Sequence, residues 1–398
     1  MKVPSNLASL IIDDPARLAD LCDALRRAGT FAFDTEFIRE RSYKPVVCLV
    51  QVATADRIAL IDPLELDLLP FWDLVVDPSI ETVVHSGQQD LEMCHLATGR
   101  LPANVFDVQV AAGFVGPAYP LSYDKIVREV LAIHIEKGET FSEWAQRPLT
   151  ASQLRYAVED VLYLLPIKSR LERRLQEKGR LMWLREEMQR LESADLYACE
   201  AAESFLKVRG AGSLHRQNMA VLRELAIWRE RAAEVRDVPT RTLLKDPVLV
   251  GIARRMPRNV KELADLRGMP DPVVRRSGMD ILDAVRRGRA VPEDQCPPAE
   301  ERTDERPQDR MVADLASVVG QALCMEANLA HSLFATREHY LELALAVCGR
   351  RRPADAPPPR LLTGWRREFA GDRLTSALKG QASLRMKGLP RTPHLELE

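Results

Sequence analysis

The sequence has few cysteines, and they show no regular spacing. Seven cysteines in 398 residues form neither a Cys-x-x-Cys motif nor the Cys/His pattern of a zinc site. Their odd number argues against the disulfide framework of a small secreted protein. We therefore expect reduced thiols and a cytoplasmic protein.

Long apolar runs are also absent. No stretch approaches the ~18 consecutive apolar residues of a membrane span, and the N-terminal residues 1–20 do not resemble a signal peptide. We expect no membrane role. The hydrophobic content of 46% and charged content of 29% are typical of a folded globular protein. The length favours two or three domains.

The charge is unevenly distributed along the chain. Residues 206–292 hold 19 Lys and Arg against 10 Asp and Glu, a local charge of +9, so the rest of the chain, whose total is -2, carries -11. A basic module beside an acidic one fits a polyanion-binding accessory attached to a carboxylate-rich metal site. A solvated charged helical surface explains the same charge equally well.

The first half of the sequence predicts an α/β domain over residues 1–195. Period-two and β-rich runs predict strands at residues 31–37, 46–53, 57–62, 81–86 and 104–108. A helix is expected directly after the fourth strand. A further helix should begin after Thr150, a plausible cap, and run to Gly179.

The second half predicts two helical modules. Residues 206–292 have the pattern of a small basic helical bundle. Residues 293–309 are rich in Pro and charge, which predicts a linker. Residues 310–385 are helical again, with a proline-rich loop at 350–360.

Two carboxylates in the first strand could share a cation. Asp34 and Glu36 are two residues apart, so the period of a strand places both on one face. Acidic residues that merely end a strand at a turn are the alternative. Asp90 lies just inside the next helix, where a carboxylate can also be an ordinary N-terminal residue.

A third candidate group lies on a helix. Tyr156 and Asp160 are four residues apart and therefore share a helical face, although a solvated pair is the alternative. The combination is more specific than any part. D-x-E on a strand, H-x-G-x-x-D at a strand-to-helix junction and Y-x-x-x-D on a helix follow in one order within one domain.

This arrangement resembles the three exonuclease motifs of the tyrosine-containing subgroup of the DEDD superfamily. The flanking residues 34–53, 85–93, 106–114 and 141–164 resemble the ribonuclease D family. The resemblance implies a ribonuclease H-like α/β exonuclease domain, a mixed sheet flanked by helices, followed by two all-helical HRDC-like modules, residues 206–292 and 310–385. It also implies a 3′-to-5′ exoribonuclease that releases nucleoside 5′-monophosphates.

The same resemblance implies roles for the five motif residues. Asp34 would bridge two Mg²⁺ or Mn²⁺ ions, and Glu36 and Asp160 would complete the site of the water-activating ion. Asp90 would hold the second ion through water, and Tyr156 would orient the attacking water. Oxygen donors are the ligands that these hard cations prefer, and two such ions can activate water and stabilise a leaving 3′-oxygen.

Other polar residues near the motifs have structural interpretations. We interpret His85 as structural, because it ends a strand two residues before a glycine, and Asp107 as a cap. Arg147 could reach a substrate phosphate or form a structural salt bridge. In the basic module, the candidate RNA contacts are Arg254, Arg255, Arg275, Arg276, Arg286 and Arg287.

The resemblance points to the 3′ ends of transfer RNA precursors and other small stable RNAs as substrates, and a monomer is the default. Two other functions stay open: a noncatalytic RNA-binding platform, and a DNA exonuclease of the same superfamily. Because the five motif residues precede the basic module, a chain without residues 206–398 is expected to retain the chemistry.

Overall fold

The computed structural model describes residues 6–135, 143–197, 204–297, 306–350, 357–387 and 394–397. Residues 141–142 of the segment 141–164, residues 298–305 of the expected linker and residues 351–356 of the proline-rich loop lie outside these residues. The chain divides into two compact units: residues 1–36, 47–196 and 305–398 form the first, and residues 37–46 and 197–304 form the second.

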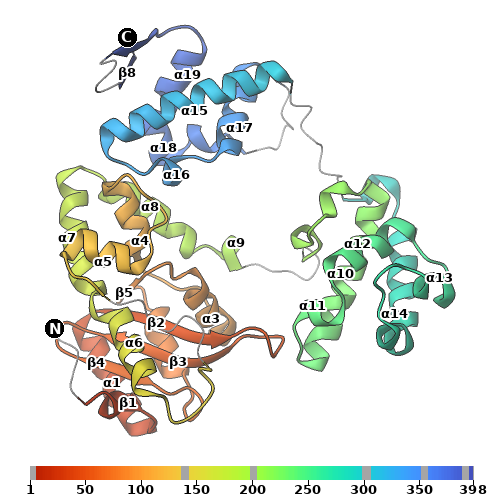
Figure 1. The fold of residues 1–398 in the computed structure, drawn as a ribbon, viewed down its shortest axis with the longest axis horizontal. Helices are drawn as coiled ribbons and strands as arrows, with labels where there is room; N and C mark the ends of the chain where they lie inside the picture. The colour runs from red at the N-terminus through yellow and green to blue at the C-terminus, as the bar shows by residue number, and fades with distance from the viewer. Residues whose placement is uncertain are drawn as a thin grey trace. The chain divides into compact units, whose positions relative to one another are not determined.

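A six-stranded mixed sheet is the centre of the first unit (Figure 1). Its order is β1-β4-β3-β2-β5-β6, and β4 pairs parallel with β1 and antiparallel with β3, while β5 pairs parallel with both β2 and β6. The strands are β1 (Ile11–Ile12), β2 (Thr30–Ile38), β3 (Val46–Ala53), β4 (Ile58–Ile61), β5 (Glu81–Val84) and β6 (Val105–Asp107). All five expected strands are present. The structure also contains the two-residue strand β1, which the sequence did not predict.

Alternation along β2 separates a packed face from a polar face. Phe31 and Phe33 pack against Phe71, and Phe33 also contacts Trp72; both partners belong to α2 (Leu69–Val75). Helices α1 (Pro15–Ala28) and α3 (Gln88–Thr98) lie next to α2. Because successive side chains of a strand point to opposite faces, Asp34 faces away from this aromatic cluster.

The predicted helix from Thr150 to Gly179 is two helices. Thr150 caps α6 (Ala151–Leu162) in a capping box with Gln153, as expected. The chain then breaks at Tyr163, and α7 (Leu164–Glu177) begins. Pro166 explains the break, because proline has no N–H for the Leu162 carbonyl and its ring clashes with that carbonyl in a continuous helix.

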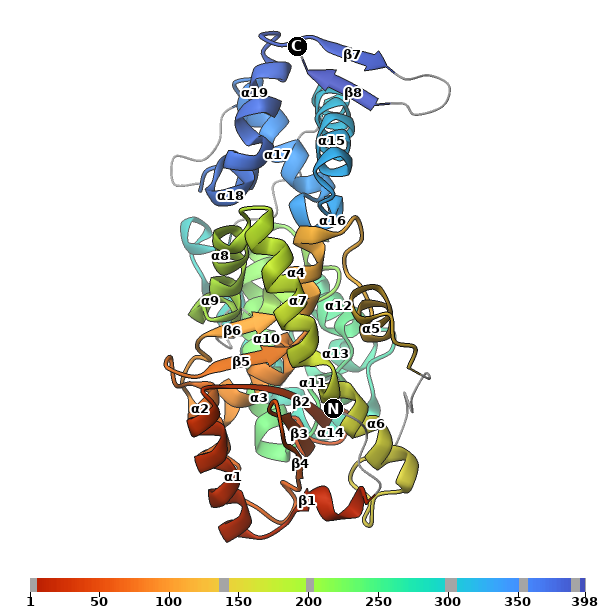
Figure 2. The same ribbon diagram turned by 90° about the vertical axis from the view of Figure 1, so that its left-hand side faces the viewer.

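Four further helices belong to the first half of the chain. They are α4 (Val108–Val115), α5 (Tyr123–Leu131), α8 (Leu181–Leu191) and α9 (Ala194–Tyr197). Helix α7 lies along α4 and α5 and reaches β5, while α6 lies beside β4 (Figure 2).

The C-terminal helices pack on α4 and α8 within the first unit. They are α15 (Pro307–Ala327), α16 (His331–Phe334), α17 (Arg337–Val347), α18 (Gly364–Arg366) and α19 (Asp372–Leu378). Arg180 donates to the carbonyl oxygens of Phe114 and Ala327 at 2.6 and 2.8 Å, which ties the two parts together. A strand pair follows, β7 (Leu384–Lys387) with β8 (His394–Leu397), where the sequence predicted only helix up to residue 385.

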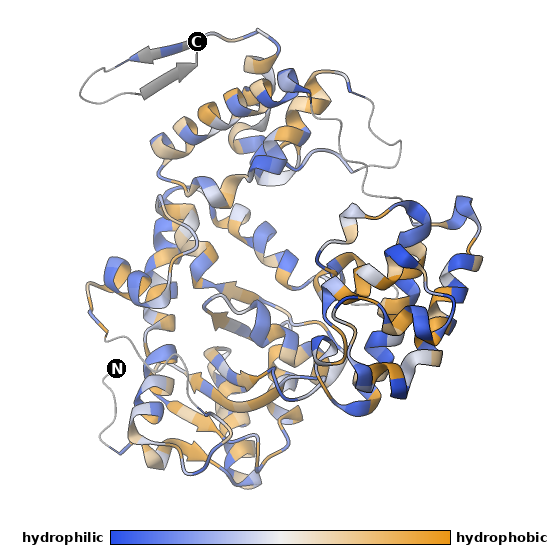
Figure 3. Cartoon of the chain, turned by 45° about the vertical axis from the view of Figure 1, so that its right-hand side comes forward, coloured by the Kyte–Doolittle hydropathy of each residue, from blue (hydrophilic) through white to orange (hydrophobic). Residues whose placement is uncertain are grey.

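The second unit contains a helical bundle. Its helices are α10 (Arg216–Arg236), α11 (Thr240–Leu243), α12 (Asp246–Arg255), α13 (Val260–Ala264) and α14 (Asp271–Ala290). The bundle has its own apolar core, and each long helix has a hydrophobic and a hydrophilic side (Figure 3). Across the described residues of both units, no helix is long and apolar enough to cross a membrane.

Candidate active site

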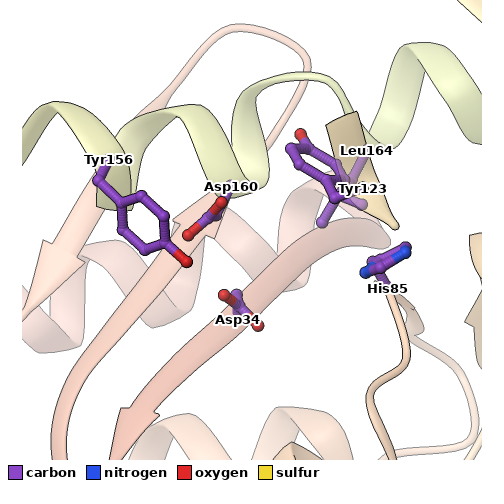
Figure 4. A pocket seen from close by; sticks show the side chains of 6 residues that line it. All are labelled: Asp34, His85, Tyr123, Tyr156, Asp160 and Leu164. Carbon is purple, nitrogen blue, oxygen red and sulfur yellow. The ribbon is translucent and has the colours of Figure 1, made fainter. Parts of the chain in front are cut away.

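The carboxylates of β2 and α6 meet above the polar face of the sheet. Oxygens of Asp34, Glu36 and Asp160 lie within 4.8 Å of one another, which is close enough to share a metal ion. Figure 4 shows Asp160 and the hydroxyl of Tyr156 directed from α6 toward Asp34 on β2. The two spacings, two residues on a strand and four on a helix, therefore bring four of the five motif residues together.

Asp90 stands beside this group rather than in it. It lies in the first turn of α3, is buried, and accepts a hydrogen bond from the hydroxyl of Thr35 on β2. Its charge is nevertheless close enough to raise the pKa of Asp34 and Glu36.

Burial raises the pKa of all four carboxyl groups, and repulsion by the neighbouring site carboxylates adds to the rise at Asp34 and Glu36. Burial is the largest cause in each case. The pKa of Asp34 lies well above its usual value, because Asp90, Asp160 and Glu36 add their repulsion. The pKa values of Glu36, Asp160 and Asp90 rise to about 8, 7 and 6.

Asp160 has an acceptor atom that no described residue satisfies. Its Oδ2 is buried without a hydrogen-bond partner in the part of the chain that the structure describes. The neighbouring hydroxyl of Tyr156 favours the charged form of Asp160 and opposes part of the rise in its pKa. A buried oxygen without a donor is costly, and repelling carboxylates need a counter-charge. The residues present therefore fit a divalent cation with oxygen ligands.

A cavity of about 130 Å³ opens beside the carboxylates. It is lined by Asp34, His85, Tyr123, Tyr156, Asp160 and Leu164 (Figure 4). His85 is hydrogen-bonded to the carbonyl oxygen of Leu121, which fits its structural interpretation, but its ring also lines the cavity. Tyr123 and Leu164 belong to none of the sequence motifs. They line the cavity because α5 and α7 begin beside the sheet.

The other two polar candidates have structural contacts. Asp107 caps α4 through the amides of Gln109 and Val110, as predicted, and also accepts from the amides of Ser86 and Gly87. Arg147 forms the salt bridge that we considered beside a phosphate contact. Its Nε and Nη2 donate to Asp62 at 2.5 and 2.7 Å, and Nη2 also donates to the carbonyl of Cys48 at 2.7 Å.

Comparison with known proteins decides the family. The 3′-5′ exonuclease domain family matches residues 10–176, and the HRDC domain family matches residues 218–285. Ribonuclease D of Granulibacter bethesdensis is 35% identical over 93% of both chains, and that of Pseudomonas paraeruginosa is 36% identical over 92% of this chain and 97% of its own. This chain belongs to the ribonuclease D family.

A solved structure of the ribonuclease D family supports the assignment. Escherichia coli RNase D superposes with a TM-score of 0.81 at 29% identity, covering 93% of this chain and 98% of that one. The expected exonuclease domain with a mixed sheet and the helical HRDC region are confirmed. As a member of this family, the protein is a 3′-to-5′ exoribonuclease that acts on RNA and requires a divalent metal.

Proposed function

We propose that the protein trims the 3′ ends of transfer RNA precursors and other small stable RNAs, as a cytoplasmic monomer that uses two Mg²⁺ or Mn²⁺ ions. The carboxylate group of Asp34, Glu36 and Asp160, with its unpaired buried Oδ2, is the observation that carries the catalytic part.

Four residues would hold the metals. Asp34 would contact both ions, Glu36 and Asp160 would complete one site, and Asp90 would hold the other through water. Bound there, the ions would supply an acidified water and charge stabilisation for the leaving 3′-oxygen.

Tyr156 would orient the attacking water without accepting its proton. Burial, followed by the charges of Asp160, Glu36 and Asp34, raises the pKa of its phenol far above the usual value. The phenol therefore keeps its hydrogen at neutral pH and can act as a hydrogen-bond partner only. The Tyr156 side chain lines the cavity together with Asp34 and Asp160, and its hydroxyl points toward them (Figure 4).

The substrate proposal is supported by one relative and by charge. The Escherichia coli RNase D is described as an exoribonuclease involved in structured RNA processing. The +9 segment would hold the body of such an RNA through its phosphates. We propose residues 1–195 as the catalytic domain, 206–292 as the HRDC domain, 293–309 as the linker and 310–385 as the second HRDC-like domain. The HRDC match at 218–285 lies inside the second of these ranges.

The test is cleavage of a 3′-extended transfer RNA and a DNA strand of matched sequence, in Mg²⁺, in Mn²⁺ and in EDTA, with products resolved by length. We expect metal-dependent shortening of the RNA to its mature 3′ end with release of nucleoside 5′-monophosphates. Asp34→Asn is the control and should lose several orders of magnitude in turnover while staying folded. Equal activity in EDTA, or a folded Asp34→Asn variant with normal turnover, would refute the metal site.

A further inference from the structure

The cavity has two chemically different ends. Asp34, Asp160 and Tyr156 form the carboxylate end, and His85, Tyr123 and Leu164 form what we call the ring end (Figure 4). The rings of His85 and Tyr123 are neighbours, with centroids 5.6 Å apart. The proposed metal chemistry uses only the carboxylate end.

Tyr123 contributes its ring but not its hydroxyl. The hydroxyl donates to the carbonyl oxygen of Glu159 at 2.8 Å and accepts from the amide of Tyr163 at 3.3 Å. Both partners are backbone groups at the end of α6, so this bond pair fixes the ring. Leu164 has no polar side-chain atom. Of these three residues, only His85 therefore has a polar side-chain atom available for a substrate.

Geometry fixes the hydrogen-bonding role of His85. Its Nε2 lies 3.0 Å from the carbonyl oxygen of Leu121, which can only accept, so Nε2 carries the hydrogen. The same carbonyl accepts from the side-chain amide of Gln109 at 3.0 Å, which holds it in place. In the neutral ring Nδ1 is then an acceptor, and it has no hydrogen-bond partner among the residues that the structure describes.

A substrate group that binds Nδ1 of His85 must donate a hydrogen bond. This donor must be present in every nucleotide of the substrate. An exonuclease that proceeds through mixed sequences cannot depend on a base N–H, because the donors of the four bases differ. The ribose hydroxyls are present in each nucleotide, and the 2′-hydroxyl is the group that distinguishes RNA from DNA. The cavity of about 130 Å³ has room for a hydroxyl group.

We propose that Nδ1 of His85 accepts a hydrogen bond from the 2′-hydroxyl of the 3′-terminal ribose and thereby favours RNA over DNA. This inference rests on the proposed function in one respect, the position of the scissile phosphate at the carboxylate end. It makes His85 a specificity-determining residue for a reaction that the carboxylates carry out.

The experiment measures single-turnover removal of the terminal nucleotide in Mg²⁺ from four versions of one single-stranded RNA. One is unmodified, and the others carry a 2′-deoxy terminal, a 3′-deoxy terminal or a 2′-deoxy penultimate nucleotide. For the unaltered protein we expect the 2′-deoxy terminal nucleotide to be removed about tenfold more slowly, the scale of one hydrogen bond. The 2′-deoxy penultimate substrate should react like unmodified RNA.

His85→Phe keeps a ring beside Tyr123 and removes the acceptor. It should remove the ribo and 2′-deoxy terminal nucleotides at equal rates. His95→Phe is the matched control, because His95 also bonds a carbonyl oxygen, that of Arg100, but lies outside the cavity; it should keep the tenfold ratio. Should His85→Phe not fold, His85→Gln, which retains an amide donor and a carbonyl acceptor, should fold and keep part of the ratio.

Three results would overturn the inference: no 2′-deoxy effect in the unaltered protein, an unchanged ratio in folded His85→Phe, or an effect confined to the 3′-deoxy substrate. An unchanged ratio with both rates lowered would identify His85 as a purely structural support of Leu121. Failure of the unaltered protein to shorten unmodified RNA would instead contradict the proposed function, so the two failures are distinguishable.

Discussion

The ring and the hydroxyl of Tyr156 have different surroundings. The ring packs near Trp144, with centroids 6.0 Å apart, and the hydroxyl is directed toward the carboxylates of Asp34 and Asp160 (Figure 4). Tyr156→Phe keeps the ring, so we expect little change in RNA affinity and a fall in turnover of about 10²–10⁴-fold, the range for a positioned hydrogen-bonding group. Single-turnover rates and equilibrium binding separate the two effects. Tyr163→Phe is the control, and an unchanged rate for Tyr156→Phe would remove the phenol from the mechanism.

The raised carboxyl pKa values predict how stability depends on pH and metal. In the folded protein the pKa of Glu36 is raised to about 8 and that of Asp160 to about 7, whereas both are ~4 in an unfolded chain. Between about pH 4 and 8 the folded state therefore binds more protons than the unfolded state. As pH rises through this window, these groups lower the free energy of unfolding. Because metal ions need deprotonated carboxylates, stabilisation by Mn²⁺ should be larger at pH 8 than at pH 6.

Thermal unfolding in EDTA and in Mn²⁺ checks this prediction. Comparing the unaltered protein with Glu36→Gln separates the contribution of Glu36 to stability from that of other groups that titrate in the same pH range. In EDTA the variant should gain stability relative to the unaltered protein as pH rises, and it should respond less to Mn²⁺. A difference between the two proteins that stays constant from pH 5 to 9 would mean that Glu36 is not destabilised by its surroundings.

Local spacing predicted the carboxylates, but it could not predict the ring end of the cavity. Asp34 with Glu36, and Tyr156 with Asp160, share a face because of the strand and helix periods alone. Tyr123 belongs to a different helix, and Leu164 begins a helix that exists only because the chain breaks near Pro166. Their place beside His85 depends on packing between elements, which no short sequence pattern contains.

At the scale of elements, Arg147 joins the segment before α6 to the end of β4. Asp62 is buried, and only 25% of the Arg147 side chain is exposed. Arg147→Met leaves a buried carboxylate without its partner, so we expect the free energy of unfolding to fall by about 2–3 kcal/mol, less than for a fully buried pair. Urea unfolding measures the loss, and Asp62→Asn combined with Arg147→Met should recover part of it. Normal stability with a weaker salt dependence of RNA binding would favour the phosphate contact instead.

Elements with a strong local signal were predictable. The five main strands follow from alternation, and Thr150 caps its helix as expected. The two-residue β1 is too short for a periodic signal, and it exists through its pairing with β4. Helix α15 begins at Pro307, inside the stretch that composition assigned to a linker, because proline is favoured in a first helical turn.

For the whole molecule, the C-terminal helices pack on the helices of the exonuclease domain within the first unit. Glu187 of α8 is buried and accepts hydrogen bonds from Arg366 and from the indole of Trp365, the latter at 2.9 Å. These contacts lower the pKa of Glu187 against the effect of burial. Trp365 also packs on Phe114 of α4, with ring centroids 4.9 Å apart. Sequence position alone cannot reveal such a contact.

A chain that ends at residue 205 should therefore not be the independent active domain that the sequence suggested. It would leave Glu187 without Arg366 and expose Phe114, which Trp365 covers in the full chain. We expect it to aggregate or to unfold several degrees below the full chain. The matched control lacks only residues 206–292, replaced by a short flexible linker, and should stay folded and shorten single-stranded RNA. A stable, active 1–205 chain would show that the C-terminal helices are dispensable.

The basic module offers a final prediction at this scale, because its arginines differ in their partners. Arg286 and Arg287 pair with Asp283 and Glu224, whereas Arg255, Arg275 and Arg276 are exposed and have no ion-pair partner among the described residues. The second set has its charge available for phosphates. Changing these three to Gln should flatten the slope of log affinity for structured RNA against log salt by roughly 0.7–0.9 for each phosphate that is no longer neutralised.

Gln at Arg286 and Arg287 is the matched control. It should change the slope less, because those guanidiniums already have carboxylate partners whose charge offsets theirs. Binding of the full-length variants from low to moderate salt measures both slopes. Coincident slopes for all three proteins would mean that the excess positive charge does not contact RNA, and a larger effect of the paired set would place the RNA on the face that carries Arg286 and Arg287 instead.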